Sequence, residues 1–262
     1  MPDRIDAAFA QATRLIFGKP LSPISKYAEW LRQRVPGGRS VKSCFGSREA
    51  YVPEYGAFKT MPGEKIASEE DAALAGGKRI EEHDARSLSS MIDKLPSIAY
   101  FVPAYAEGSN MDVEQSFLYL NCMHIRHCFD PFTSKNCAYC FSIMDAESVF
   151  GMHRIKGAGF SLHCYNSLKI QRCFEVDGGI GCTDCYFCHN VENLQDCIFC
   201  FNAKGMRYAV GNLEVGREKY SEFRKKFLAW MVPRLEAEGR LPFDIYDVLC
   251  TNRKKQVSRC NL

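Results

Sequence analysis

Most cysteines of this chain recur at intervals of twelve residues, and this period limits the possible folds more than any other feature of the sequence. Eleven of the fourteen cysteines lie between Cys122 and Cys200. Cys164, Cys188 and Cys200 each begin a triplet of cysteine, an aromatic ring and asparagine. A fixed period of this kind is typical of a repeat architecture, in which each unit stacks on the next.

The pattern becomes explicit when the sequence is cut every twelve residues from Phe117. The sixth, ninth and twelfth positions carry cysteine or a small apolar residue in most units, and the tenth is apolar in every unit but the first. The first position is rich in Phe, Tyr and His. This division into inside and outside positions indicates a β-solenoid. The units are FLYLNCMHIRHC, FDPFTSKNCAYC, FSIMDAESVFGM, HRIKGAGFSLHC, YNSLKIQRCFEV, DGGIGCTDCYFC, HNVENLQDCIFC and FNAKGMRYAVGN.

The length of one turn is the open question in this pattern. Glycine occupies the fifth position in alternate units, at Gly157, Gly181 and Gly205. This alternation favours a mainly β protein, a Cys-rich β-solenoid in which two twelve-residue half-coils make one turn of 24 residues. Residues 24 apart, such as Cys164 and Cys188, would then stack at the strand spacing of about 4.8 Å. A turn of twelve residues is the alternative geometry.

The sequence on either side of the repeats indicates three parts. Residues 1–107 are expected to form a helical start followed by a mixed α/β lobe or an N-terminal cap, and residues 108–215 the solenoid. Residues 216–262 are expected to form a C-terminal capping helix and a tail, because open strand edges need cover. Val113 and Ser116 match the ninth and twelfth positions of an earlier unit, which favours a cap that opens the solenoid.

Helical spacing of apolar residues marks the flanking elements. The first helix carries a stripe that includes Phe9 and Leu15, and a second helix is expected to begin near Pro23. Residues 87–95 have the spacing of a helix that Pro96 should end, followed by a strand over residues 98–102. The apolar residues of 216–240 predict a long amphipathic helix.

Five cysteines with CxxC spacing are the candidate metal ligands: Cys182, Cys185, Cys188, Cys197 and Cys200. Thiolates at this spacing often hold zinc or an Fe–S cluster. The other interpretation is that they fill the sixth, ninth and twelfth positions, where cysteine packs as a small hydrophobe and needs no cofactor. This interpretation is favoured because Val149 and Ala209 occupy the same positions in other units. Disulfides between neighbouring coils also fit the spacing.

Other side chains of the repeats are expected to stack. Histidines at the aromatic first position favour ring stacking, and the row of first-position rings would be an interaction surface if it is exposed and core if it is covered. Asn166, Asn190 and Asn202 at the second position predict a ladder of hydrogen-bonded turn residues. The histidines of this zone are His124, His127, His153, His163 and His189.

No arrangement typical of a catalytic site is found in the sequence. It lacks the P-loop, Rossmann, HExxH and GxSxG motifs. An enzyme that acts on polysaccharides would need acidic residues that converge on one groove, and the aspartates of the repeats are interpreted as scattered over different positions. The chain is therefore expected not to be an enzyme. The aspartates considered are Asp130, Asp145, Asp177, Asp184 and Asp196.

Composition argues against several classes of partner. The formal net charge is +3 and 25% of the residues are charged, so neither a nucleic-acid-binding surface nor a disordered acidic tract is indicated. No secretory signal and no apolar run of membrane-spanning length are recognised, so no membrane partner is expected. The cysteines are therefore expected to be mostly reduced thiols in the cytoplasm.

The last repeat and the segment after it carry a family resemblance. The run from Cys197-x2-Cys200 through Tyr208, Asn212 and Tyr220 resembles the terminal repeat of uncharacterised Cys-rich repeat proteins from archaea and candidate-phylum bacteria. The resemblance covers about residues 128–220. It implies a repeat fold and adds no activity.

These features predict a non-catalytic accessory or assembly subunit. Its rigid Cys-rich solenoid would dock on a protein partner or a larger complex. The alternative is a metalloprotein that uses the five clustered cysteines to hold an Fe–S cluster for electron transfer, or zinc as a structural ion.

Overall fold

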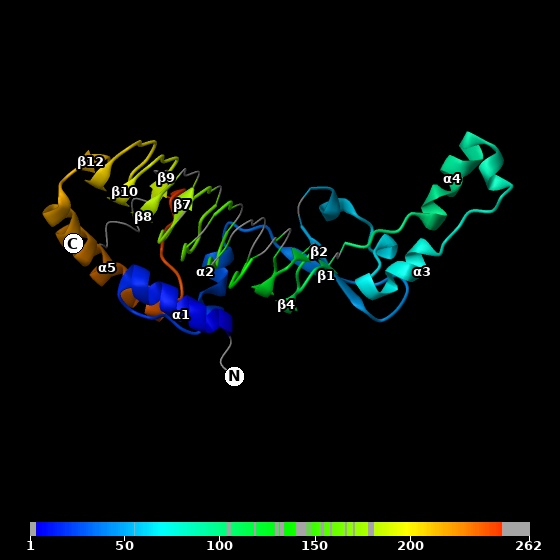
Figure 1. The fold of residues 1–262 in the computed structure, drawn as a ribbon, viewed down its shortest axis with the longest axis horizontal. Coiled ribbons are helices and arrows are strands. Elements are labelled where there is room, and N and C mark those ends of the chain that lie inside the picture. Colours follow the sequence, from blue (N-terminus) through cyan, green and yellow to red (C-terminus); the bar gives the residue numbers. More distant parts are fainter. Residues whose placement is uncertain are drawn as a thin grey trace.

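The chain forms an elongated molecule, and it is a mixed α/β protein rather than the mainly β protein expected. A stack of short coils has helices along one flank, and an arm projects from the end of the stack where the first coils lie (Figure 1). The computed structural model describes residues 4–54, 56–103, 106–117, 119–128, 131, 134–139, 146, 148–152, 155–157, 159–165, 167–169, 171–177 and 181–247.

The helices precede, interrupt and follow the strands. The helices are α1 (Arg4–Phe17), α2 (Ala28–Arg32), α3 (Ala72–Gly76), α4 (Leu88–Ile98) and α5 (Arg217–Glu238). An antiparallel hairpin of β1 (Gly38–Lys42) and β2 (Glu49–Pro53) lies between α2 and α3. The remaining strands are β3 (Ala106–Glu107), β4 (Met111–Glu114), β5 (Tyr119–Leu120), β6 (Met123–Arg126), β7 (Val176–Asp177), β8 (Thr183–Tyr186), β9 (Cys188–His189), β10 (Gln195–Ile198), β11 (Arg207–Val210) and β12 (Leu213–Glu214).

One turn of the solenoid takes twelve residues. β10 pairs in parallel with β8 on one side and with β11 on the other, so that Cys197 lies in register with Cys185 and Ala209. β4 and β6, at the beginning of the stack, keep the same step. The expected turn of 24 residues is therefore wrong, and about seven turns lie between residues 106 and 210.

Left-handed backbone turns at every third residue produce this short coil. Every third residue from Gly181 to Gly211 has a φ between 43° and 67°. Eight of these eleven residues are glycine, asparagine or aspartate, the residues that enter the left-handed region most readily. The alternation between Gly181 and Asn193 at the fifth position thus reflects two residues that both suit a corner. It carries no information about the length of the turn.

The residue that follows each left-handed turn lies in the solenoid core. Cys185, Cys188, Val191 and Leu194 are successive examples, and all four are buried in one cluster of side chains. A coil therefore has four sides of three residues, each with one inward position. The CxxC spacing is the direct consequence of this three-residue period.

Hydrogen bonds between coils confirm part of the expected asparagine ladder. The Asn190 side-chain amide donates to Asn202 Oδ1 at 2.8 Å, between residues twelve apart. Asn166 lies outside the described residues. At the last coil, the Asn212 side chain donates to the Phe201 carbonyl and accepts from its N–H, both at 2.8 Å. With β12 paired antiparallel to β11, these bonds satisfy the edge of the final coil.

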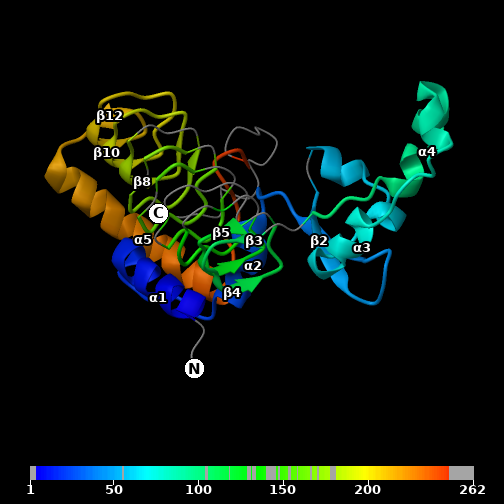
Figure 2. The ribbon, with the colours of Figure 1, turned by 45° about the vertical axis from the view of Figure 1, so that its right-hand side comes forward.

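The apolar outer positions of the coils are covered by helices. α1 and α5 lie side by side along one flank of the stack (Figure 2). The rings of Phe17 and Phe174 are 5.2 Å apart, and those of Phe187 and Phe227 are 5.9 Å apart. These contacts belong to a single apolar layer between the helices and the tenth and eleventh positions of the coils. The expected C-terminal helix is confirmed as α5, which packs along this flank and continues through Pro233.

The N-terminal helices are also confirmed, with one change in their buried face. A short 3₁₀ turn over Ile24–Tyr27 leads into α2, close to the expected start at Pro23. Phe9 is fully buried in α1, as the apolar stripe predicts. Leu15, assigned to the same stripe, is instead 48% exposed, because it faces the groove described below.

Residues 38–103 form the arm. Its core is small and consists of Ala50, Val52 and Ile66. Its base contacts the first coils, where the rings of Phe58 and Phe117 are 4.9 Å apart, and α3 and α4 lie farther out (Figure 1). α4 continues through Pro96, so the strand expected over residues 98–102 is reduced to a bridge at Phe101.

Candidate functional site

The five candidate metal ligands lie inside the solenoid, on adjacent coils. Cys182, Cys185 and Cys188 occupy three successive inward positions of one coil, and Cys197 and Cys200 occupy two of the next. All five are fully buried. Their thiols contact one another in a continuous series from Cys182 to Cys197. The structure therefore brings together all five residues that the sequence selects.

These thiols also have backbone partners. Cys185 Sγ donates to the Thr183 carbonyl at 3.0 Å, and Cys197 Sγ donates to the Gln195 carbonyl at 3.4 Å. Burial raises the pKa of the Cys173 thiol, in the coil above, so that it stays protonated at neutral pH. No group of three or more His, Cys, Asp or Glu among the described residues is arranged to hold a metal ion. The metal assignment stays a prediction.

The histidines of the repeats lie apart from one another. His124 Nδ1 is 3.0 Å from Asp112 Oδ2, and its Nε2 accepts from Arg4 at 3.1 Å. His127, whose pKa burial lowers to about 4, lies 3.3 Å from the Tyr51 hydroxyl. His153 lies outside the described residues. These contacts tie the coils to α1 and to the arm, and they do not form a common site.

The row of first-position rings is largely covered. Phe117 is buried against Phe58 of the arm, Tyr165 is buried, and His189 is half-buried. Phe141 lies outside the described residues. The described members of this row are therefore mostly core, and they do not form an interaction surface.

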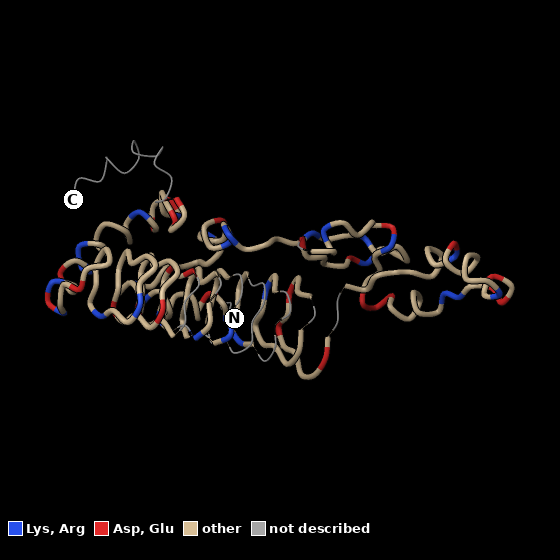
Figure 3. Tube along the Cα trace, turned by 90° about the horizontal axis from the view of Figure 1, so that it is seen from above, with Lys and Arg blue, Asp and Glu red and all other residues tan. Residues whose placement is uncertain are grey.

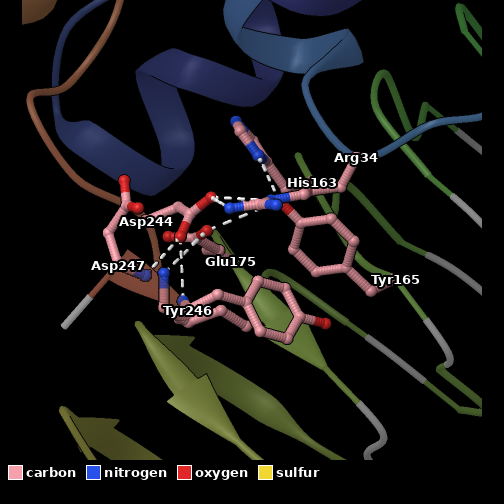
Figure 4. A network of polar contacts seen from close by, with 8 residues as sticks. Arg34, His163, Tyr165, Glu175, Asp244, Tyr246 and Asp247 are labelled. Carbon is pink, nitrogen blue, oxygen red and sulfur yellow. Dashed lines mark hydrogen bonds and ion pairs between the residues drawn. The ribbon is translucent and has the colours of Figure 1, made fainter. Parts of the chain in front are cut away.

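A buried polar network attaches the segment after α5 to the coils (Figure 4). Arg34 donates to Asp244 Oδ2 through Nε at 2.8 Å and through Nη2 at 2.5 Å. Asp244 Oδ1 accepts from the backbone N–H groups of Tyr246 and Asp247. A paired, hydrogen-bonded charge of this kind is costly to break when it is buried.

Glu175, His163 and Tyr165 form the second half of this network (Figure 4). Glu175 Oε1 accepts from the Ile245 N–H at 3.2 Å, and Tyr165 Oη lies 3.0 Å from His163 Nδ1. Burial raises the pKa of Glu175 well above its ordinary value and lowers that of His163 to about 3. The partners of Glu175 and Asp244 are mainly backbone groups, so the arrangement fixes the chain rather than preparing an acid–base pair.

Two aspartates that the sequence analysis judged scattered are in fact neighbours. Asp184 and Asp196 both occupy the eighth position, twelve residues apart, on coils that pair in register. Their shared position was visible in the repeat alignment. The turn of 24 residues obscured its meaning, because it placed consecutive units on opposite halves of a coil.

The outer helix of the arm carries an apolar stripe that nothing covers within the described chain. Leu88, Ile92 and Leu95 of α4 are 68%, 52% and 44% exposed, and no residue of this helix is buried. Their spacing of four and three residues places them on one side of the helix. Helical spacing identified these residues, but it could not show that they remain uncovered.

Charges give no comparable concentration. Basic and acidic residues are intermingled over the solenoid, its helices and the arm (Figure 3). Of the helices that the structure describes, none combines the length and the apolar character that crossing a membrane requires. The comparisons with known proteins give no further guide, because no family model, curated protein or solved structure matches this chain.

Proposed function

We propose that this protein is a non-catalytic accessory subunit that docks on a partner protein through the arm. The exposed apolar stripe of α4 is the observation that carries this proposal. The helix is held away from the solenoid, at the far end of the arm (Figure 1). Exposed apolar residues on one helix face are the usual anchors of a helix that lies in an apolar groove of its partner.

The magnitudes support α4 over the solenoid as the docking surface. Full burial of a leucine or isoleucine side chain stabilises a complex by about 1.5–3 kcal/mol. Leu88, Ile92 and Leu95 leave much of that free energy unused. The apolar outer positions of the coils are already covered by α1 and α5. The solenoid would then serve as the rigid body that holds the arm.

A site-specific photo-cross-linking experiment tests this proposal. A photoreactive residue at position 92 is expected to yield one discrete adduct with a different polypeptide in the cells that make the protein. The same residue at Asp93, exposed on the other side of α4, is the matched control. The adduct should disappear when Leu88 and Leu95 are replaced by serine.

Two outcomes would overturn the proposal. The absence of an adduct at position 92 would leave the stripe without a partner. An adduct formed only with a second copy of the chain would make α4 a dimer contact rather than a docking element. Light scattering on the purified protein distinguishes the second case.

A metalloprotein is the second candidate, and the continuous series of five thiols favours it. Anaerobic purification followed by metal analysis and a visible spectrum tests it. Stoichiometric iron with broad absorption near about 400 nm would indicate a thiolate-bound cluster, and zinc alone would indicate a structural ion. Loss of the metal in Cys185→Ala, with retention in Cys44→Ala on the arm, would locate it.

A further inference from the structure

A polar groove lies where the eighth positions of the coils meet α5 and α1. Its volume is about 300 Å³, at the lower end of the range for small-molecule sites. One wall is a column of side chains from successive coils, and the other is contributed by the first two turns of α5. The lining residues are Leu15, Arg172, Asp184, Asp196, Tyr208, Arg217, Tyr220, Ser221 and Arg224.

The two aspartates of the column lack direct partners. Asp184 and Asp196 are half-buried, and neither forms a hydrogen bond or a close ion pair with any residue that the structure describes. Burial raises the pKa of both carboxyl groups, and the charge of Asp196 raises that of Asp184 further. Carboxylates in this condition gain from a ligand that donates hydrogen bonds.

Tyr220 provides an independent sign of a missing ligand. Its side chain is 3% exposed and lines the groove, yet its hydroxyl has no hydrogen-bond partner among the described residues. Buried hydroxyl groups are nearly always paired, so an orphan next to a cavity needs an explanation. A bound molecule that bonds to the hydroxyl supplies one.

The charges of the groove select the kind of molecule. Arg172, Arg217 and Arg224 line the groove together with the two aspartates. Arg224 already donates to the Tyr186 hydroxyl at 2.7 Å and to the Ile16 carbonyl at 3.0 Å. A cation would meet the arginines and an anion would meet the carboxylates. A neutral molecule with many donors and acceptors satisfies both sets.

We propose that this groove binds a neutral saccharide, whose hydroxyl groups donate to Asp184 and Asp196 and bond to the hydroxyl of Tyr220. The half-buried ring of Tyr208 offers an apolar face for the carbon side of a sugar ring. The column repeats at the coil spacing of about 4.8 Å, which is close to the length of one sugar unit. The requirement for acids that converge on one groove is therefore met here.

Saturation-transfer NMR with neutral monosaccharides and disaccharides, each at millimolar concentration, tests the proposal. At least one sugar should bind to the wild-type protein. Asp196→Asn should weaken that binding about tenfold or more, the usual scale for a lost charge-assisted hydrogen bond. Glu192→Gln, the same chemical change on the same coil but outside the groove, should leave binding unchanged.

Tyr220→Phe separates a ligand contact from a merely structural hydroxyl. The variant keeps the ring and its packing against Tyr208, and loss of an unpaired hydroxyl should not lower the melting temperature. Sugar binding should nevertheless fall several-fold. Unchanged binding in both variants, or the absence of binding by every sugar, would overturn the proposal. Binding of spermidine or inorganic phosphate in place of sugars would also overturn it.

Discussion

The flank of the solenoid and the outer helix of the arm both present apolar side chains at regular spacing, but only those of the flank are covered. Phe174 and Phe187 lie beneath α1 and α5, each with 1% exposure. Ile92 of α4 is half exposed and has no neighbouring layer. The comparison teaches that the same pattern serves stability in one region and remains available for contact in the other. Substitutions should therefore have opposite consequences in the two regions.

The largest expected effect is in the flank. Phe174→Ala removes a ring that packs against Phe17, Trp30 and Phe187. Its loss should lower the free energy of unfolding by about 3–5 kcal/mol, because the surrounding layer cannot close the cavity fully. Denaturant unfolding followed by circular dichroism measures the change. Ile92→Ala on the arm is the control, with an expected change below about 0.5 kcal/mol. Equal losses would remove the contrast between the two regions.

The second effect concerns acid stability, and it comes from His163 beneath the flank. The folded pKa of His163 is about 3 and its ordinary value is 6.5. Between these values the unfolded chain binds a proton that the native state does not. Stability should therefore fall as the pH drops through this window, by up to about 1.4 kcal/mol per pH unit. His163→Phe should flatten this part of the profile, whereas His83→Gln on the arm should not.

Glu175 contributes the opposite slope. Its folded pKa lies well above its ordinary value of 4.5, so the native state holds a proton that the unfolded chain releases. Its contribution to stability should fall as the pH rises above about 4.5. Glu175→Gln should remove that fall and leave the acid side of the profile steeper than in the wild type. Unfolding free energies measured from pH 3 to pH 8 test both variants, and parallel profiles for all proteins would contradict the assignment.

A smaller effect is expected at the corners of the coils. Asn193 has a φ of 53°. Asn193→Ala should cost about 1 kcal/mol, because a side chain that cannot bond locally to the backbone resists the left-handed region. Asn193→Gly should be close to neutral, since glycine enters this region freely. Thermal unfolding of the pair measures the difference. If alanine is the better tolerated of the two, the three-residue corner rule fails.

The smallest effect on stability is expected on α4. Replacement of Ile92 and Leu95 by serine should change the free energy of unfolding by less than about 0.5 kcal/mol, because both side chains are largely exposed. The same replacement should reduce the binding of a fluorescent hydrophobic dye to the folded protein. A large loss of stability would show that α4 packs against part of the chain and is not available to a partner.

Much of the solenoid could be predicted from its sequence, because the twelve-residue period repeats one environment many times. The buried cysteines, the first helix and the C-terminal helix follow from the spacing of apolar residues. The length of a turn could not be resolved, since Gly181 and Asn193 satisfy the same backbone requirement although their side chains differ. That error separated Asp184 from Asp196 and concealed the groove.

Other features depend on contacts that no local pattern encodes. Arg34 and Asp244 are 210 residues apart in the chain and meet only because α2 and the segment after α5 lie on the same flank. The exposure of Leu88 and Ile92 likewise depends on what the rest of the molecule leaves uncovered. Periodicity reveals which side chains share a face, but not which surface lies opposite that face.

The closure of each coil after four three-residue sides has a consequence for how such a protein can change in length. An insertion of twelve residues adds one coil, keeps every inward side chain in phase, and moves the final coil about 4.8 Å farther from the arm. An insertion of three residues keeps the inward phase but rotates all later coils by one side, which carries their tenth positions away from α1 and α5. The solenoid is therefore a spacer whose length is set in discrete steps.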